Sequence, residues 1–170
     1  MFKFVQVISV IGSLLACAAG CQPAGPPTAQ MPGEANPFLV TSEPTGAIPV
    51  GQARAEALDG QAVSVIGFIG GSKEPFVGGV AVFTVVDPKV PYCADDEGCP
   101  TPWDYCCHQD DVKSNVATVK FVDDQGKVIN TDARQLLNVK PLNLVVLEGV
   151  AQRDEAGNLT LLTRQLFIKQ

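Results

Sequence analysis

The residues with the most reactive side chains gather in one segment, residues 88–115. It holds four of the six cysteines, the only tryptophan, both tyrosines and the only histidine: Tyr92, Cys93, Cys99, Trp103, Tyr105, Cys106, Cys107 and His108. Such a set can staple a loop with disulfides, bind a thiophilic metal ion or supply a redox-active thiol. A loop of this length inside a compact domain usually has a function of its own.

Two disulfide bonds are the first expectation for Cys93, Cys99, Cys106 and Cys107. An exported protein, which the N-terminal pattern described below predicts, meets conditions that oxidise thiols. The insert contains few aliphatic residues, so cross-links would replace a core. The adjacent Cys106 and Cys107 would pair with Cys93 and Cys99 more easily than with each other. The insert would then be a disulfide-stapled interaction surface.

Zinc or another thiophilic metal is the alternative, because four thiolates and the His108 imidazole are chemically sufficient ligands. The spacing differs from the familiar zinc modules, which use two C-x-x-C-like hooks, since Cys106 and Cys107 are contiguous. Outside a metal site, His108 would be a solvent-facing loop residue. A redox-active thiol pair is a further alternative, disfavoured because acidic residues surround the cysteines and a reactive thiolate needs a positive neighbourhood.

The aromatic residues of the insert allow two interpretations. Tyr92, Trp103 and Tyr105 are candidates for a binding surface, because aromatic side chains on loops often anchor partners. They are equally suited to a miniature core packed against the cross-links. The acidic residues of the insert do not follow the order of a calcium-binding loop and indicate a solvated surface.

The N-terminus has the organisation of a lipoprotein signal peptide. Lys3 forms a short positive region, and the apolar run that follows is too short for a comfortable transmembrane helix. The sequence L-A-C-A-A-G-C then resembles a lipobox, in which small residues precede a cysteine that becomes acylated. Cys21 is preferred to Cys17, since three small residues precede it and an even number of cysteines follows. This predicts a signal peptide at 1–20 and a lipid-anchored protein of the cell envelope. It would face the periplasm or the exterior, with the outer membrane as a possible site.

The rest of the chain divides into a tether and one domain. Residues 21–46 are rich in Pro and Gly and predict a tether that begins at the lipidated cysteine. An apolar cluster within it, Phe38 to Val40, is expected either to dock on the domain or to lie near the membrane. Residues 47–170 are long enough for one domain with a real core.

The pattern of the domain predicts five strands and two short helices. A helix is expected at 50–58 and a second, brief one that runs through Leu137, with Thr131 and Asp132 as N-cap candidates and capping-box spacing between Asp132 and Gln135. Strands are expected at 61–70, 80–86, 117–122, 142–150 and 159–168. A slip of the alternation around Leu161 and Leu162 predicts a β-bulge there.

This order, with a helix between the third and fourth strands, is that of the OB-fold, a small five-stranded Greek-key barrel. The phrases LDGQAVSVIGFI, VFTVVDP and LNLVVLEGVAQRDEAGNLTLLTRQLFI resemble strands of bacterial OB-fold domains, over roughly residues 50–170. The resemblance implies a mostly β, OB-like barrel with the cysteine-rich insert between strands 2 and 3. Another small barrel or sandwich is the competing fold. The phrase CPTPWDYCC resembles segments of uncharacterised bacterial envelope proteins and supplies no function.

Charge and motifs disfavour several functions. The net charge of −6 disfavours nucleic acid and gives no attraction to anionic lipid heads, so acyl chains are expected to hold the protein to the membrane. Nucleophile elbow, P-loop, dinucleotide and H-E-x-x-H motifs do not occur. We therefore expect a non-enzymatic binding or assembly module without a cofactor, whose partner is another envelope protein or a small ligand. A metal-binding or redox protein that uses the Cys/His insert is the alternative.

Overall fold

The computed structural model describes residues 36–94 and 97–169. The predicted signal peptide, Cys17, Cys21 and the tether as far as residue 35 lie outside these ranges. Within them, no helix combines the length and the apolar character needed to cross a membrane.

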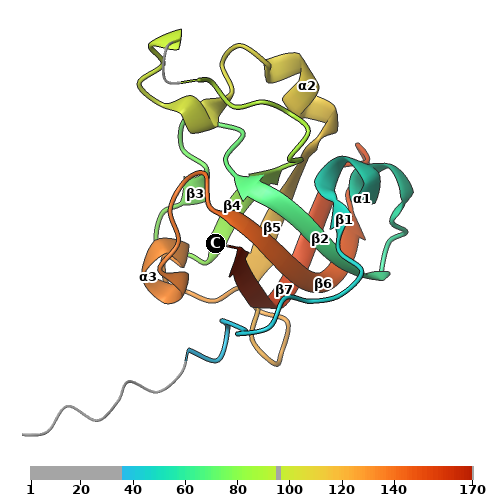
Figure 1. The fold of residues 1–170 in the computed structure, drawn as a ribbon. Coiled ribbons are helices and arrows are strands. Elements are labelled where there is room, and N and C mark those ends of the chain that lie inside the picture. The colour runs from blue at the N-terminus through green and yellow to red at the C-terminus, as the bar shows by residue number, and fades with distance from the viewer. Residues whose placement is uncertain (1–35, 95–96, 170) are drawn as a thin grey trace, which may run out of the picture. The chain divides into compact units, whose positions relative to one another are not determined.

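Five strands form a closed barrel (Figure 1). They are β2 (Ala62–Ile69), β4 (Val82–Val86), β5 (Val116–Phe121), β6 (Leu144–Arg153) and β7 (Leu159–Lys169). Around the barrel the order is β2, β4, β5, β7, β6 and back to β2, with β5 and β7 parallel and the other pairs antiparallel. Two short strands, β1 (Ile48–Pro49) and β3 (Phe76–Val77), pair with β2 and β4. The order confirms the OB-like five-stranded barrel predicted from the sequence.

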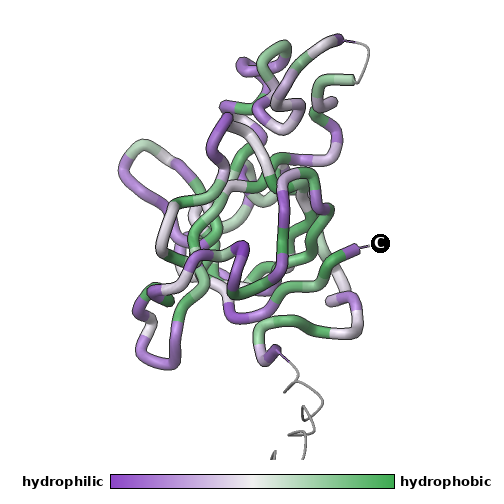
Figure 2. Tube along the Cα trace, turned by 90° about the vertical axis from the view of Figure 1, so that its left-hand side faces the viewer, coloured by the Kyte–Doolittle hydropathy of each residue, from purple (hydrophilic) through white to green (hydrophobic). Residues whose placement is uncertain are grey.

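The interior of the barrel is filled by alternate residues of β2 and β5, whereas β6 buries Val145, Val146 and Leu147 in succession. In β5, for example, Ala117, Val119 and Phe121 are buried, whereas the residues between them are partly exposed. Figure 2 shows the apolar segments gathered in the barrel wall. The Phe121 and Phe83 rings stack in this core with their centroids 6.2 Å apart. Each buried side chain of this size contributes about 1.5–3 kcal/mol to folding.

The helix predicted at 50–58 is present as α1 (Val50–Glu56). It covers one opening of the core. It buries Val50 and Ala53, and Gly67 of β2 makes room for it. A Cβ atom at Gly67 would lie 2.7 Å from Val50 Cγ2, closer than real contacts allow. At the other end of the helix, Arg153 donates hydrogen bonds to the carbonyl oxygens of Ala57 (3.1 Å) and Ala53 (3.2 Å). The Ala57 carbonyl is one that the helix C-terminus leaves without an intrahelical partner, whereas the Ala53 carbonyl also accepts a hydrogen bond from the Ala57 N–H.

The second predicted helix is α3 (Ala133–Leu137), which lies between β5 and β6. Its N-cap is Asp132, as expected, and the Asp132 carboxylate accepts a hydrogen bond from the backbone N–H of Arg134. Ala133 and Leu137 are buried in the same core as the barrel residues.

The β-bulge lies at a different place from the one predicted. The register between β6 and β7 changes between Glu148 and Gly149, which face Gln165 and Thr163, so Arg164 is the extra residue. Leu162 pairs regularly with Val150. The irregularity falls where Gly149 lets the Leu162 carbonyl approach closely, because a Cβ atom at position 149 would collide with that group.

The apolar cluster Phe38 to Val40 docks on the barrel. Leu39 forms a parallel bridge with Leu166, and the Val40 N–H donates to the Leu166 carbonyl oxygen at 3.0 Å. The Phe38 ring meets Phe121 edge-on, with centroids 6.0 Å apart. The described residues 38–40 of the predicted tether therefore pack against the barrel.

Candidate metal centre

The cysteine-rich insert connects β4 to β5 and lies at one end of the barrel. It ends in helix α2 (Gln109–Ser114), which leads into β5. Figures 1 and 2 both show this insert at the end of the barrel opposite to the one near which the chain enters the described part at Asn36. A small apolar cluster fixes the insert to the barrel; it consists of Val86, Val90, Tyr105 and Val112, with Val116 against it.

Tyr105 and two glycines position the segment that carries the cysteine pair. Tyr105 is fully buried, and its left-handed backbone (φ 56°) follows a short 3-10 turn at Pro102–Asp104. The N–H of Gly71 donates to the Trp103 carbonyl oxygen at 2.8 Å. A Cβ atom at Gly70 would lie 2.7 Å from that oxygen and 2.9 Å from Tyr105 Cε2. Only a residue without a side chain fits there, and Cys106 comes directly after this docked segment.

The four cysteine sulfurs of the insert converge on one point. The Sγ atoms of Cys93, Cys99, Cys106 and Cys107 all lie within 4.8 Å of one another. Cys106 lies at the centre of the group: its Sγ is 3.1 Å from that of Cys99, 3.4 Å from that of Cys93 and 3.8 Å from that of Cys107.

These distances do not describe disulfide bonds. A disulfide holds its two sulfurs about 2.05 Å apart, whereas the shortest of these separations is 3.1 Å. The four thiols are free, so the two expected disulfides are not present in this structure. A tetrahedral zinc site with Zn–S bonds of about 2.3 Å requires sulfurs about 3.8 Å apart. The three separations from the Cys106 sulfur are 3.1, 3.4 and 3.8 Å, at or below that value, and all four sulfurs lie within 4.8 Å of one another.

Burial and hydrogen bonding distinguish the four thiols. Cys93 is buried, Cys99 is half-buried, and Cys106 and Cys107 are exposed. Burial raises the pKa of Cys93, but hydrogen bonds from the Cys107 backbone N–H and from the other thiols outweigh it, so the pKa of Cys93 is lowered. Hydrogen bonding to Cys106 raises the pKa of Cys107 to about 11 and also raises the pKa of Cys99. Of Cys93, Cys99 and Cys107, Cys93 is therefore the thiol whose ionised form is favoured.

The remaining candidates of the insert do not join the sulfur cluster. His108 is not part of the group of converging ligand atoms; it is the N-cap residue of α2, with its Nδ1 3.7 Å from Asp111 Oδ2. Tyr105 belongs to the small core. Tyr92 is 44% exposed and packs edge-on against Phe68. Of these aromatic residues, Tyr105 therefore forms part of a small core, whereas Tyr92 is exposed.

Gly70 and Gly71 are site-building residues that the sequence analysis missed. The signal available was the pair of glycines directly after a strand, which often marks a close approach of another backbone. The residue types identified the cysteines as candidates. They did not predict that the insert turns back on itself at Tyr105.

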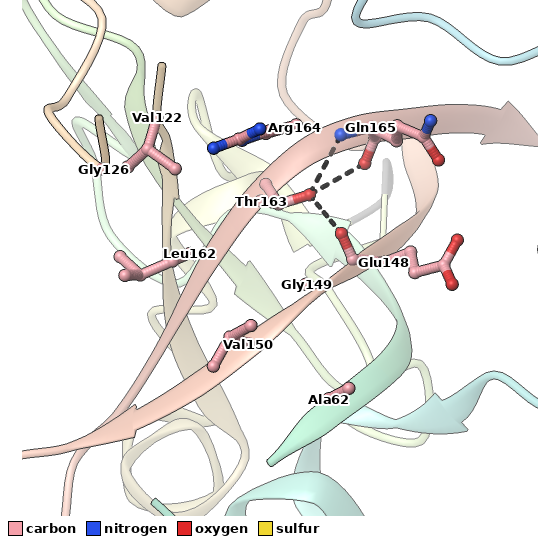
Figure 3. Close-up of a pocket in the computed structure, with 10 residues that line it drawn as sticks. All are labelled: Ala62, Val122, Gly126, Glu148, Gly149, Val150, Leu162, Thr163, Arg164 and Gln165. Atoms are coloured by element: carbon pink, nitrogen blue, oxygen red, sulfur yellow. Dashed lines mark hydrogen bonds between the residues drawn. The ribbon is translucent and has the colours of Figure 1, made fainter. Parts of the chain in front are cut away.

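A second surface feature is a shallow apolar groove across the outside of β2, β6 and β7 (Figure 3). Ala62, Val150 and Leu162 face one another across the three strands, and Val150 is 41% exposed. The β-bulge forms one end of the groove, where the Thr163 hydroxyl donates to the Glu148 carbonyl oxygen at 2.6 Å.

Comparison with known proteins gives no family: no protein-family model matches the chain, and no curated protein matches it. The function is therefore inferred from the fold and from the geometry of the insert.

Proposed function

We propose that this protein is a lipid-anchored, extracytoplasmic module that binds one zinc ion through Cys93, Cys99, Cys106 and Cys107. The observation that carries the proposal is the convergence of four free thiols within 4.8 Å of one another. Four sulfur ligands in a tetrahedral arrangement favour zinc among the available metals, since softer thiolate ligands select it over magnesium or calcium.

A metal ion would stabilise the part of the insert that the small apolar cluster does not reach. The small apolar cluster holds the two ends of the insert, Val86 to Val90 and Tyr105 to Val112, whereas the turn around Cys99 lies beyond it. A zinc ion would link Cys99 and Cys93 to the docked Cys106 and Cys107 and fix this turn. Binding of the metal and ordering of the insert would then be one process.

The location is supported by the N-terminal pattern that resembles a lipobox and by the placement of the insert. If Cys21 is acylated, the anchored segment reaches the barrel at Asn36, and the cysteine cluster lies toward the opposite end (Figures 1 and 2). The exposed sulfurs of Cys106 and Cys107 would then be open to soluble molecules of the compartment. No part of the site calls for a substrate or a catalytic base, and the module is proposed as a binding protein.

Cobalt substitution tests the zinc site directly. We expect the reduced, purified protein to take up one Co2+ ion with the intense visible absorption of a tetrahedral thiolate complex, and Zn2+ to displace it. Cys93→Ser and Cys107→Ser should each weaken that spectrum. His108→Ala should leave it unchanged, because the imidazole lies outside the sulfur cluster and faces Asp111. Weak absorption typical of octahedral cobalt, or a spectrum that depends on His108, would contradict the proposed ligand set.

A second candidate function is an assembly module that binds an envelope protein through the apolar groove. The exposed row Ala62, Val150 and Leu162 favours it, because an apolar strip on a barrel surface can bury a partner's side chains. A photoreactive amino acid at position 150 should cross-link to one defined partner in intact cells, and the same residue at exposed Leu58 should not. Equal labelling from both positions would rule out the groove as a specific site.

A further inference from the structure

The geometry of the cysteine cluster makes Cys106 the sulfur most able to leave a metal for another sulfur. Its Sγ lies within 3.8 Å of each of the other three, and nearest to Cys99 at 3.1 Å. A movement of about 1 Å would bring these two sulfurs to bonding distance. The backbone that follows Tyr105 is docked, so the Cys99 side of the insert is the part free to make that movement.

Accessibility and distance together favour the same pair. Cys93 has a relative exposure of 1% and is shielded from a solvent-borne oxidant. Cys106 and Cys107 are both exposed, and Cys99 is half-buried. An oxidant that arrives from solvent can reach either exposed sulfur, but Cys106 has the nearer partner, because its Sγ lies 3.1 Å from that of Cys99 and 3.8 Å from that of Cys107.

We infer that oxidation by hydrogen peroxide releases the metal from this site through a disulfide between Cys99 and Cys106. The inference rests on the proposed zinc site and states how that site is regulated. Zinc and a disulfide would be alternative states of the same four sulfurs.

The chemistry balances without another reactant. The Cys106 sulfur attacks one peroxide oxygen and the O–O bond breaks. Hydroxide departs, and Cys106 becomes a sulfenic acid. The Cys99 sulfur then displaces the second hydroxide and forms the S–S bond. The two sulfurs have lost two electrons, peroxide has become two water molecules after uptake of two protons, and Zn2+ leaves as a free ion. Cys93 and Cys107 remain as thiolates or thiols.

Loss of the ion follows from the number of ligands that remain. A structural zinc site needs four protein ligands, and the disulfide removes two of them together. Cys93 and Cys107 alone would leave the ion with two protein ligands. A thiol reductant should restore all four ligands, so the change should be reversible.

The test starts from zinc-loaded, reduced protein. We expect one equivalent of hydrogen peroxide to release one equivalent of zinc to a chromogenic chelator. Peptide mass mapping after alkylation should show Cys99 joined to Cys106, with Cys93 and Cys107 alkylated. Dithiothreitol and fresh zinc should restore the loaded state.

Two variants with three thiols each are compared as reduced, metal-free proteins, because each lacks one of the four ligands. Cys107→Ser keeps the Cys99–Cys106 pair and should form that disulfide with peroxide, whereas Cys99→Ser should form a disulfide several-fold more slowly. Loaded protein that keeps its zinc in peroxide, or releases it with a different disulfide or none, overturns the inference and leaves the zinc site standing. Reduced protein that never loads zinc overturns both, and this result appears before any peroxide is added.

Discussion

The substitution Gly70→Ala should weaken metal binding without touching a ligand. The added Cβ would lie 2.7 Å from the Trp103 carbonyl oxygen and 2.9 Å from Tyr105 Cε2. Ordinary contacts need about 3.5 Å or more, so the docked segment has to retreat by about 0.8 Å. The retreat strains the hydrogen bond from the Gly71 N–H to Trp103 and shifts Cys106.

The magnitude follows from what such crowding costs. Overpacking of a well-packed contact costs about 1–3 kcal/mol, and 1.4 kcal/mol corresponds to tenfold in affinity. If the segment relieves the strain by undocking, the zinc affinity should fall by about 5- to 150-fold. If the segment stays docked, the same free energy should appear as lost stability toward denaturant.

The assay is a zinc competition titration with a chromophoric chelator, paired with urea denaturation of the metal-free protein. Gly78→Ala is the matched control, because no heavy atom lies within 4 Å of a Cβ atom built there. The reasoning is refuted if Gly70→Ala retains both the affinity and the stability of the unchanged protein, or if Gly78→Ala shows equal losses.

Three further predictions test the fold around the site. The Arg134 guanidinium and backbone N–H hold the pKa of Asp132 below its usual range, so its stabilisation is full above about pH 4 and is lost as pH falls through the lower folded-state pKa. Asp132→Asn can still cap α3, and its stability should fall less steeply as the pH is lowered. Identical acid-unfolding curves would show that the ion pair does not contribute to stability. Arg153→Ala should lower the free energy of unfolding by about 1–3 kcal/mol, because carbonyl groups at the end of α1 lose their donor; urea denaturation measures this, and no change would mean that water replaces the guanidinium. Phe38→Ala should lower the free energy of unfolding by about 1–3 kcal/mol through the lost contact with Phe121. Unchanged stability would show that the apolar cluster Phe38 to Val40 does not dock in solution.

The barrel could be predicted from sequence because strand alternation reports burial directly. In β5, each buried residue is separated from the next by one partly exposed residue, and the same period of two holds in the second half of β2. Asp132 was identifiable as a cap for a similar reason, since capping depends on a side chain and its immediate neighbours. The predicted position of the bulge was wrong because the bulge depends on Gly149 in the opposite strand. The local pattern of β7 does not report that residue.

The cysteine cluster was only partly predictable. The residue types indicated sulfur chemistry, but their spacing favoured disulfides over metal because contiguous cysteines rarely bind one ion together. The left-handed turn at Tyr105 and its burial in the cluster with Val86 and Val112 direct the chain so that Cys106 and Cys107 both reach the group. Such a turn is set by tertiary packing, and spacing along the chain does not report it. His108 was included because it follows Cys107 in sequence, yet it is used as the N-cap residue of α2.

The most direct test of the central claim is the mass of the protein purified without added reductant, measured native and then denatured with an alkylating agent. The proposed zinc site predicts a native mass that carries one zinc ion, and four alkyl groups on Cys93, Cys99, Cys106 and Cys107 after denaturation. A native mass without metal, together with a denatured chain that resists alkylation and is lighter by about four hydrogens, would show two disulfides and contradict the zinc site.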